Sequence, residues 1–195
     1  MFINYGDDAA RIPDPAKMNF DGFLNDRMTE VHPSSFLFNR DVLVNDIGLV
    51  DEDLPGGYTE DYDFLLRASK VTKIAVADQP LVRVYWHGAS FFFERWKTID
   101  EALQYLLNKH PEFANQGRSR VLGQQAVAKA AMGQRKAAFS TIVATMKGNP
   151  LEKHVGCSCF AAGLPAGMAP AAHKLGKGAS GRFTTRCTMC SPLAL

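Results

Sequence analysis

Two adjacent carboxylates, Glu60 and Asp61, follow a pair of glycines in the stretch GGYTEDYDFLLRASK, residues 56–70. A carboxylate at the edge of a cleft can serve as a general base, which removes the proton of a hydroxyl as that oxygen attacks an electrophile. The glycine pair would let the backbone turn tightly and leave both carboxylates at such an edge. Acids are also common in the first turn of a helix for structural reasons, so the stretch alone leaves both interpretations open.

The same stretch predicts a helix that begins near Thr59. A threonine side chain can accept a backbone N–H at that position, and the helix dipole favours acids in the first turn. Phe64, Leu65 and Ala68 give this helix an apolar side. Asp63 and Arg67 are four residues apart, and we expect them to pair on its outer face.

Strand-forming sequences lie on both sides of this helix. SSFLFN (34–39) predicts a short buried strand, and KIAVADQPLVRVYWH (73–87) predicts one or two strands broken at Pro80. Between them, RDVLVNDIG (40–48) predicts a helix that ends at Gly48.

The pattern becomes helical from Thr98 onward. TIDEALQYLLNKH (98–110) predicts one helix, which ends before Pro111. Residues 120–149 predict two alanine-rich helices, separated near Gly133 and ended by Gly148-Asn149-Pro150. These two helices form an expected helical pair, not a repeat array.

The order of the blocks over residues 32–96 resembles the C-terminal half of the family 2 glycosyltransferases, which have the GT-A fold. The resemblance implies an α/β domain, a partial GT-A-like sheet with helices, followed by an α-helical extension and a loosely structured tail. The blocks that match are a small-residue strand at 34–38, the run R-D-V-L-V-N-D-I-G-L-V-D-E at 40–52, the helix E-D-Y-D-F-L-L-R at 60–67, a strand ending in P-L-V at 80–82, and His87 with Ser90 downstream.

The resemblance also implies a reaction. Asp61 would be the general base that deprotonates an acceptor hydroxyl, and Glu60 would orient this base or hold acceptor hydroxyls. His87 would face the donor diphosphate or its metal, although a lone histidine after a strand is also a common structural residue. Trp86 could stack on a sugar face, or it could be packed in the core. The substrates would be a nucleotide-sugar and a carbohydrate or lipid-linked acceptor, as in cell-wall or polysaccharide biosynthesis.

The family's donor-binding half is missing from this sequence. Only 31 residues precede the matched region, too few for several βα units. The complete enzyme would use a divalent metal, Mg or Mn, held by a D-x-D motif on the donor diphosphate. Asp51-Glu52-Asp53 fits that pattern literally, but its position matches the family's acceptor-side loop, so we expect no metal site in this chain. We expect a truncated gene product or one part of a split enzyme, inactive without its N-terminal half.

Charge and composition divide the chain further. Hydrophobic residues make up 46% and charged residues 22%, values typical of a globular protein. Five of the 22 basic residues follow Glu152 and no acidic residue does, so residues 1–152 carry 17 basic and 20 acidic groups. We therefore expect the C-terminal portion of a GT-A-like domain at 1–97, a helical extension at 98–152 and a basic, flexible tail at 153–195.

The tail holds features with several interpretations. Its four cysteines could bind structural zinc, but the tight first pair and the long glycine-rich interval favour free thiols. Its uncharged stretch 155–172 is a weak candidate for a membrane span, and its few cations favour no nucleic-acid partner. No signal peptide is evident, so we expect a cytoplasmic protein, with peripheral association at the inner membrane face as an alternative. The cysteines are Cys157, Cys159, Cys187 and Cys190.

A non-catalytic alternative remains for the whole chain. The alanine-rich helices within 98–147 could dock a partner protein, with the helix of Glu60 and Asp61 serving only as scaffold. The sequence identifies neither the donor sugar nor the acceptor.

Overall fold

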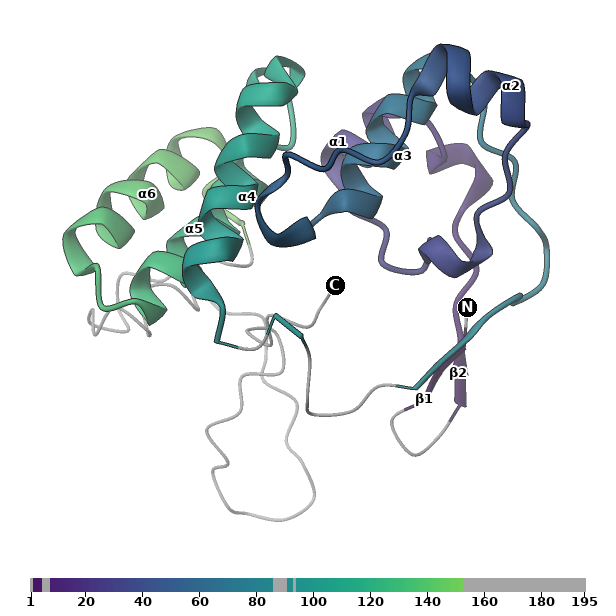
Figure 1. Cartoon of the computed structure of the whole chain (residues 1–195). Helices are drawn as coiled ribbons and strands as arrows, with labels where there is room; N and C mark the ends of the chain where they lie inside the picture. The colour runs from purple at the N-terminus through teal and green to yellow at the C-terminus, as the bar shows by residue number, and fades with distance from the viewer. Residues whose placement is uncertain (1, 5–7, 86–90, 93, 153–195) are drawn as a thin grey trace.

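The computed structural model describes residues 2–4, 8–85, 91–92 and 94–152. This part of the chain is mostly helical (Figure 1). The α-helices are α1 (Phe20–Asn25), α2 (Arg40–Val42), α3 (Glu60–Val71), α4 (Trp96–Lys109), α5 (Arg118–Ala131) and α6 (Arg135–Gly148). Short single-turn helices are η1 (Pro15–Lys17), η2 (Pro33–Ser35), the π-helical η3 (Leu43–Ile47), η4 (Pro55–Gly57) and η5 (Pro111–Ala114).

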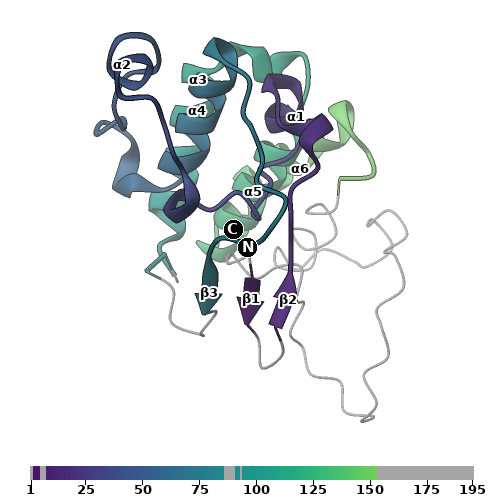
Figure 2. The same cartoon turned by 90° about the vertical axis from the view of Figure 1, so that its right-hand side faces the viewer.

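Three short strands lie side by side below the helices in Figure 2, in the order β2-β1-β3. β1 (Phe2–Asn4) pairs antiparallel with β2 (Asp8–Ala10) and parallel with β3 (Arg83–Tyr85). The predicted α/β class with a partial GT-A-like sheet is not supported, because the described residues place only these three-residue strands in a sheet. The helical character predicted for the second half of the chain is confirmed.

The two strands predicted beside α3 are largely wrong. Residues 33–35 form η2, and residues 36–39 belong to no helix and pair with no described strand. Of the stretch 73–87, only β3 is in a ladder. The physical reason is that β-rich sequence becomes a strand only when a neighbouring backbone accepts and donates its hydrogen bonds.

The predicted helices are confirmed. α3 and α4 cover the two apolar-periodic stretches, and Gly133 separates α5 from α6. The α2–η3 turn ends at Gly48, which has a positive φ of 83°. α6 packs along α5 and α5 along α4, so the last three helices form one layer (Figure 1).

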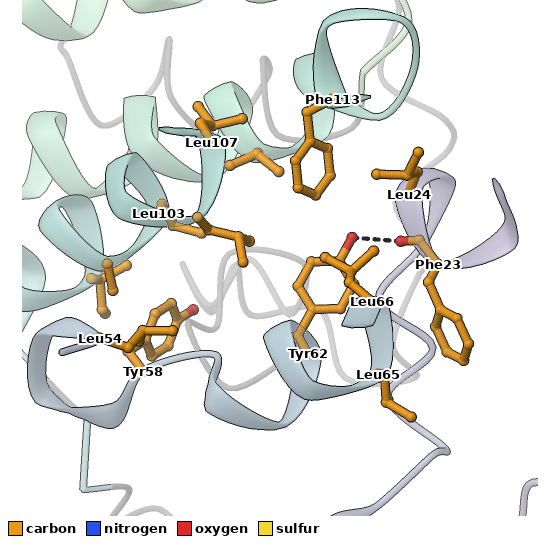
Figure 3. Close-up of a cluster of buried hydrophobic side chains, with 14 of the residues drawn as sticks. Phe23, Leu24, Leu54, Tyr58, Tyr62, Leu65, Leu66, Leu103, Leu107 and Phe113 are labelled. Atoms are coloured by element: carbon orange, nitrogen blue, oxygen red, sulfur yellow. Dashed lines mark hydrogen bonds between the residues drawn. The ribbon is translucent and has the colours of Figure 1, made fainter. Parts of the chain in front are cut away.

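One hydrophobic core joins this layer to the first half of the chain. Leu103 and Leu107 of α4 and Phe113 of η5 meet Leu66 of α3 and Leu24 of α1 in Figure 3. The core thus takes side chains from both sides of residue 98. Among the described residues, no helix is long and apolar enough to cross a membrane.

Candidate functional site

The backbone turns sharply before the two candidate carboxylates. Gly56 and Gly57 have φ values of 61° and 67°, as the predicted tight turn requires. Thr59 also lies in the left-handed region, at φ 70°, where β-branched residues are rare. The prediction that its side chain caps α3 is wrong: the Thr59 hydroxyl is buried and has no hydrogen-bond partner among the described residues.

Asp61 lies in the first turn of α3 and is partly open to solvent, with 24% of its side chain exposed. Its Oδ1 accepts hydrogen bonds from the Arg27 guanidinium and from the Tyr62 backbone N–H, both at 2.8 Å. Arg27 in turn lies over the ring of Tyr58, with 5.7 Å between the guanidinium carbon and the ring centre. The second carboxylate oxygen of Asp61, Oδ2, has no hydrogen bond with the part of the chain that the structure describes.

Glu60 is exposed beside Asp61. Its carboxylate lies near Gly57, where a Cβ added to the glycine would be 3.1 Å from Glu60 Oε2. Glu60 forms no ion pair with the described residues, so its carboxylate is open to solvent above the turn.

Asp63 lies two residues after Asp61 and, unlike Asp61, is closed off from solvent. Its side chain is fully buried and accepts hydrogen bonds from His110 Nε2 at 2.8 Å, Lys109 Nζ at 3.0 Å and Arg67 Nε at 3.0 Å. Burial alone would raise the pKa of Asp63, but these hydrogen bonds outweigh it and hold the pKa well below its ordinary value. The predicted Asp63–Arg67 pair is confirmed, but its place on the outer face is wrong, because Lys109 and His110 cover the Asp63 carboxylate.

Two of the residues that bind Asp63, Arg67 and Lys109, also contact the loop after η3. The Arg67 guanidinium donates to the carbonyl oxygens of Ile47, Gly48 and Leu49 at 2.6, 3.3 and 2.9 Å. Further along the loop, Asp51 binds the Lys109 ammonium and accepts from the Tyr105 hydroxyl at 2.9 Å. The hydrogen bond from Lys109 lowers the pKa of Asp51.

Because Asp51 is engaged in this way, the literal D-x-D at residues 51–53 does not offer a free pair of carboxylates to a metal ion. The described residues contain no group of three or more His, Cys, Asp or Glu side chains that could hold a metal. The four cysteines lie outside the described residues.

Two buried hydrogen bonds at the Tyr62 hydroxyl hold the inner face of α3. The Tyr62 hydroxyl donates to the carbonyl oxygen of Phe23 at 2.5 Å (Figure 3) and accepts from the Arg120 guanidinium at 2.6 Å. Burial raises the pKa of Tyr62 against the opposing effect of Arg120. These two hydrogen bonds join α1, α3 and α5 at the residue that follows Asp61.

The structure therefore brings Glu60 and Asp61 together at the start of α3, while Trp86 and His87 lie outside the described residues. Sequence reasoning missed three cations that contact the first half of α3: Arg27 binds Asp61, Lys109 binds Asp63, and Arg120 binds the Tyr62 hydroxyl. Arg27 lies 34 residues from Asp61 and Lys109 46 residues from Asp63, so no local spacing could have revealed the pairs. Comparison of the chain with protein-family models, curated proteins and solved structures found no match.

Proposed function

We propose that this chain is the acceptor-side part of a family 2 glycosyltransferase, in which Asp61 is the general base. The proposal rests on the two oxygens of the Asp61 carboxylate: Oδ1 accepts two hydrogen bonds, whereas Oδ2 has no hydrogen bond with any described residue, on a side chain that solvent can reach. A base needs a fixed carboxylate with one oxygen available to a substrate proton. Asp63 cannot take this role, because its carboxylate is buried and used by three donors.

In the proposed reaction the acceptor O–H donates to Oδ2 of Asp61. The proton moves to Oδ2 as the hydroxyl oxygen forms a bond to the anomeric carbon of the sugar. The bond from that carbon to the nucleoside diphosphate breaks, and the diphosphate leaves with the electron pair. Arg27 holds the Asp61 carboxylate in a fixed orientation through Oδ1, and exposed Glu60 would hold a neighbouring acceptor hydroxyl.

The donor nucleotide and any divalent metal would be held by a second half of the enzyme. A metal there would offset the charge on the leaving diphosphate. We place the acceptor among carbohydrates or lipid-linked saccharides at the cytoplasmic side of a membrane, as the family resemblance implies.

Acceptor binding tests the proposal without the donor half. We would titrate the isotope-labelled chain with a panel of oligosaccharides and follow backbone amide shifts by NMR. We expect at least one saccharide to shift the amides of residues 57–63. Asp61→Asn removes the charged acceptor of a hydrogen bond worth roughly 1.5–3 kcal/mol, so we expect binding to be at least about ten-fold weaker.

Asp53→Asn is the matched control, because Asp53 is exposed on the neighbouring loop. It should bind the same saccharide as tightly as the unmodified chain. The proposal fails if no saccharide shifts residues 57–63, or if Asp61→Asn and Asp53→Asn bind equally well.

A protein-interaction module is the second candidate, and one feature of α6 favours it. Phe139, Val143 and Met146 are exposed large apolar residues spaced four and three positions apart, so they lie along one side of the helix. A photo-crosslinking residue at position 143 should give a defined adduct in extracts of the source cells, whereas one at Lys136 should not. Equal labelling from both positions would count against this candidate.

A further inference from the structure

The side of α6 that faces away from α5 is apolar and open to solvent. Figure 1 shows α6 as the outer helix of the layer formed by α4, α5 and α6. The buried side of α6 carries Ala138, Ile142 and Thr145. On the exposed side, Phe139, Val143 and Met146 form an apolar stripe, and between 36% and 41% of each of these residues is exposed.

Cations surround this stripe without any acid to offset them. Residues 113–151 contain six basic residues and no Asp or Glu. Two of the six are engaged within the fold. Arg120 donates to the Tyr62 hydroxyl. Lys129 pairs with Asp100. The other four are exposed and form no ion pair with the described residues: Arg118, Arg135, Lys136 and Lys147.

Three of these four cations lie on the same side of α6 as the stripe. Successive residues of a helix differ by about 100° in direction, so Lys136 and Lys147 lie within about 40° of Val143 and Arg135 within about 80°. Arg135 and Lys136 begin the helix and Lys147 is in its last turn. The stripe is therefore flanked by positive charge at both of its ends.

The start of α5 places the fourth cation beside the end of α6. A Cβ added to Gly148 would lie 2.3 Å from the hydroxyl oxygen of Ser119, so the two helix ends are in contact. Arg118 is the chain neighbour of Ser119 and is exposed. Leu151, which follows α6, is 80% exposed. The combination of apolar and cationic side chains thus continues past the end of α6.

We propose that the exposed side of α6 from Arg135 to Lys147, the α6 surface, docks on an anionic lipid bilayer. The apolar stripe would enter the boundary between the headgroups and the acyl chains, and the cations would bind the anionic headgroups. Each lysine or arginine near such a surface strengthens binding about five-fold. This inference goes beyond the transferase proposal and holds whether or not Asp61 is a base.

Charge favours this occupant over two others from the same chain. A second copy that docked through its own α6 would bring the same unpaired cations to the interface. Residues 153–195 carry five basic residues and no acidic residue, so they would add to the positive charge. An anionic bilayer offers an apolar phase and negative charge together along the whole stripe, which is the combination that the α6 surface matches.

Vesicle binding tests the proposal on the full chain. We would measure co-sedimentation with vesicles of phosphatidylserine and phosphatidylcholine, mixed at about 30:70, and with vesicles of phosphatidylcholine alone, both near physiological salt. We expect at least ten-fold tighter binding to the anionic vesicles. The difference should vanish at about 1 M salt, where charges are screened over roughly 3 Å.

Matched variants locate the contact. Val143→Glu should weaken binding to the anionic vesicles at least ten-fold, because it puts an acid in the stripe. Val44→Glu makes the same charge change at another exposed valine, in η3, and should bind within about two-fold of the unmodified chain. Lys136→Gln combined with Lys147→Gln changes only exposed side chains, so the fold should be retained, and should also weaken binding at least ten-fold.

A spin-labelled lipid identifies the part of the chain that touches the bilayer. In anionic bicelles that contain a doxyl-labelled lipid, we expect the NMR amide signals of residues 136–147 to broaden more than those of residues 60–71. This measurement separates docking through α6 from attraction of the basic residues beyond 152.

Three results would overturn the proposal. The chain could bind both kinds of vesicle equally, or Val143→Glu and Val44→Glu could bind the anionic vesicles equally. Broadening could be confined to residues outside α6, which would place the contact elsewhere. A photo-crosslink from position 143 to one protein, with no binding to vesicles, would assign the α6 surface to a protein partner.

Discussion

Asp61 and Asp63 are two residues apart in α3, yet their side chains meet different parts of the molecule. Asp61 points to the turn and to Arg27, whereas Asp63 points under α4 to Lys109 and His110. Successive positions on a helix differ by 100° in direction, so residues two apart lie on nearly opposite sides. This geometry lets one short acidic motif supply both an accessible carboxylate and a buried anchor.

Replacing Asp63 tests the anchor. Asp63→Asn removes the carboxylate to which three buried or half-buried groups donate, and we expect the free energy of unfolding at pH 7 to fall by about 3 kcal/mol. Urea unfolding followed by circular dichroism measures the loss. Asp53→Asn, at an exposed position, should change stability by less than about 0.5 kcal/mol.

The pH dependence of stability follows from the same carboxylate. The pKa of Asp63 is depressed in the folded chain, so its contribution is complete above the unfolded value of about 3.9 and is lost as the pH falls below it. The unmodified chain should therefore lose stability steadily from about pH 5 downward. The profile of Asp63→Asn should be shallower in that range, and parallel profiles would show that Asp63 contributes no such stability.

The sequence predicted the Asp63–Arg67 ion pair but not its surroundings. The spacing of Asp63 and Arg67 predicted their ion pair, because residues four apart on a helix are neighbours. It did not predict that the pair is buried, since Lys109 and His110 come from 46 and 47 residues away. Long-range pairing depends on how helices pack, and the local pattern carries no information about it.

At the scale of elements, the start of α5 depends on a close approach between its backbone and that of α1. Gly117 has a φ of 73°, and a Cβ added there would lie 1.8 Å from the carbonyl oxygen of Leu24 in α1. Gly117→Ala combines an unfavourable left-handed alanine with a backbone clash, and we expect a loss of about 3 kcal/mol.

Gly133, between α5 and α6, is the matched control. It has nearly the same φ, 74°, but a Cβ there would have no atom within 4 Å. Gly133→Ala should therefore cost only the backbone term, about 1 kcal/mol. Equal losses in thermal or urea unfolding would show that α5 does not pack against α1 at this point.

The contact of α1, α3 and α5 through the Tyr62 hydroxyl is testable in the same way. Tyr62→Phe leaves the Phe23 carbonyl and the buried Arg120 guanidinium without this partner, and we expect a loss of about 2 kcal/mol. Tyr105→Phe removes one hydrogen bond to Asp51 on the loop and should cost clearly less than Tyr62→Phe. A Tyr62→Phe variant as stable as the unmodified chain would show that the two hydrogen bonds of the Tyr62 hydroxyl do not stabilise the fold.

Helices could be predicted at this scale and strands could not. α3, α4, α5 and α6 follow from apolar periodicity and from glycine and proline at their ends, all of which are local. The stretches 34–39 and 73–82 have strand-like composition and alternation, but assignment as a strand needs a partner. Phe36 and Phe38 alternate with exposed Leu37, but these stretches also contain the η2 turn and bends at Asp78 and Gln79, and most of their length pairs with no described strand.

At the scale of the whole molecule, one hydrophobic core spans the boundary that the sequence predicted at residue 98. Nine of its buried members precede that residue and eight follow it. Those that follow are Ile99, Ala102, Leu103, Leu106, Leu107, Phe113, Val121 and Ala128. Six of these eight are large, and burying them contributes on the order of 10 kcal/mol, which equals the whole stability of a typical domain.

Truncation therefore decides whether 1–97 and 98–152 are separable units. We expect the fragment 1–97 to give a poorly dispersed NMR spectrum and no cooperative unfolding, because Phe23, Tyr62 and Leu66 would lose the apolar surface that covers them. Adding the fragment 96–152 in trans should restore dispersion, since the missing side chains return with α4, η5 and α5. A well-dispersed 1–97 fragment that unfolds cooperatively by itself would show two independent domains, and the helical layer would then be an extension in the sense predicted from sequence.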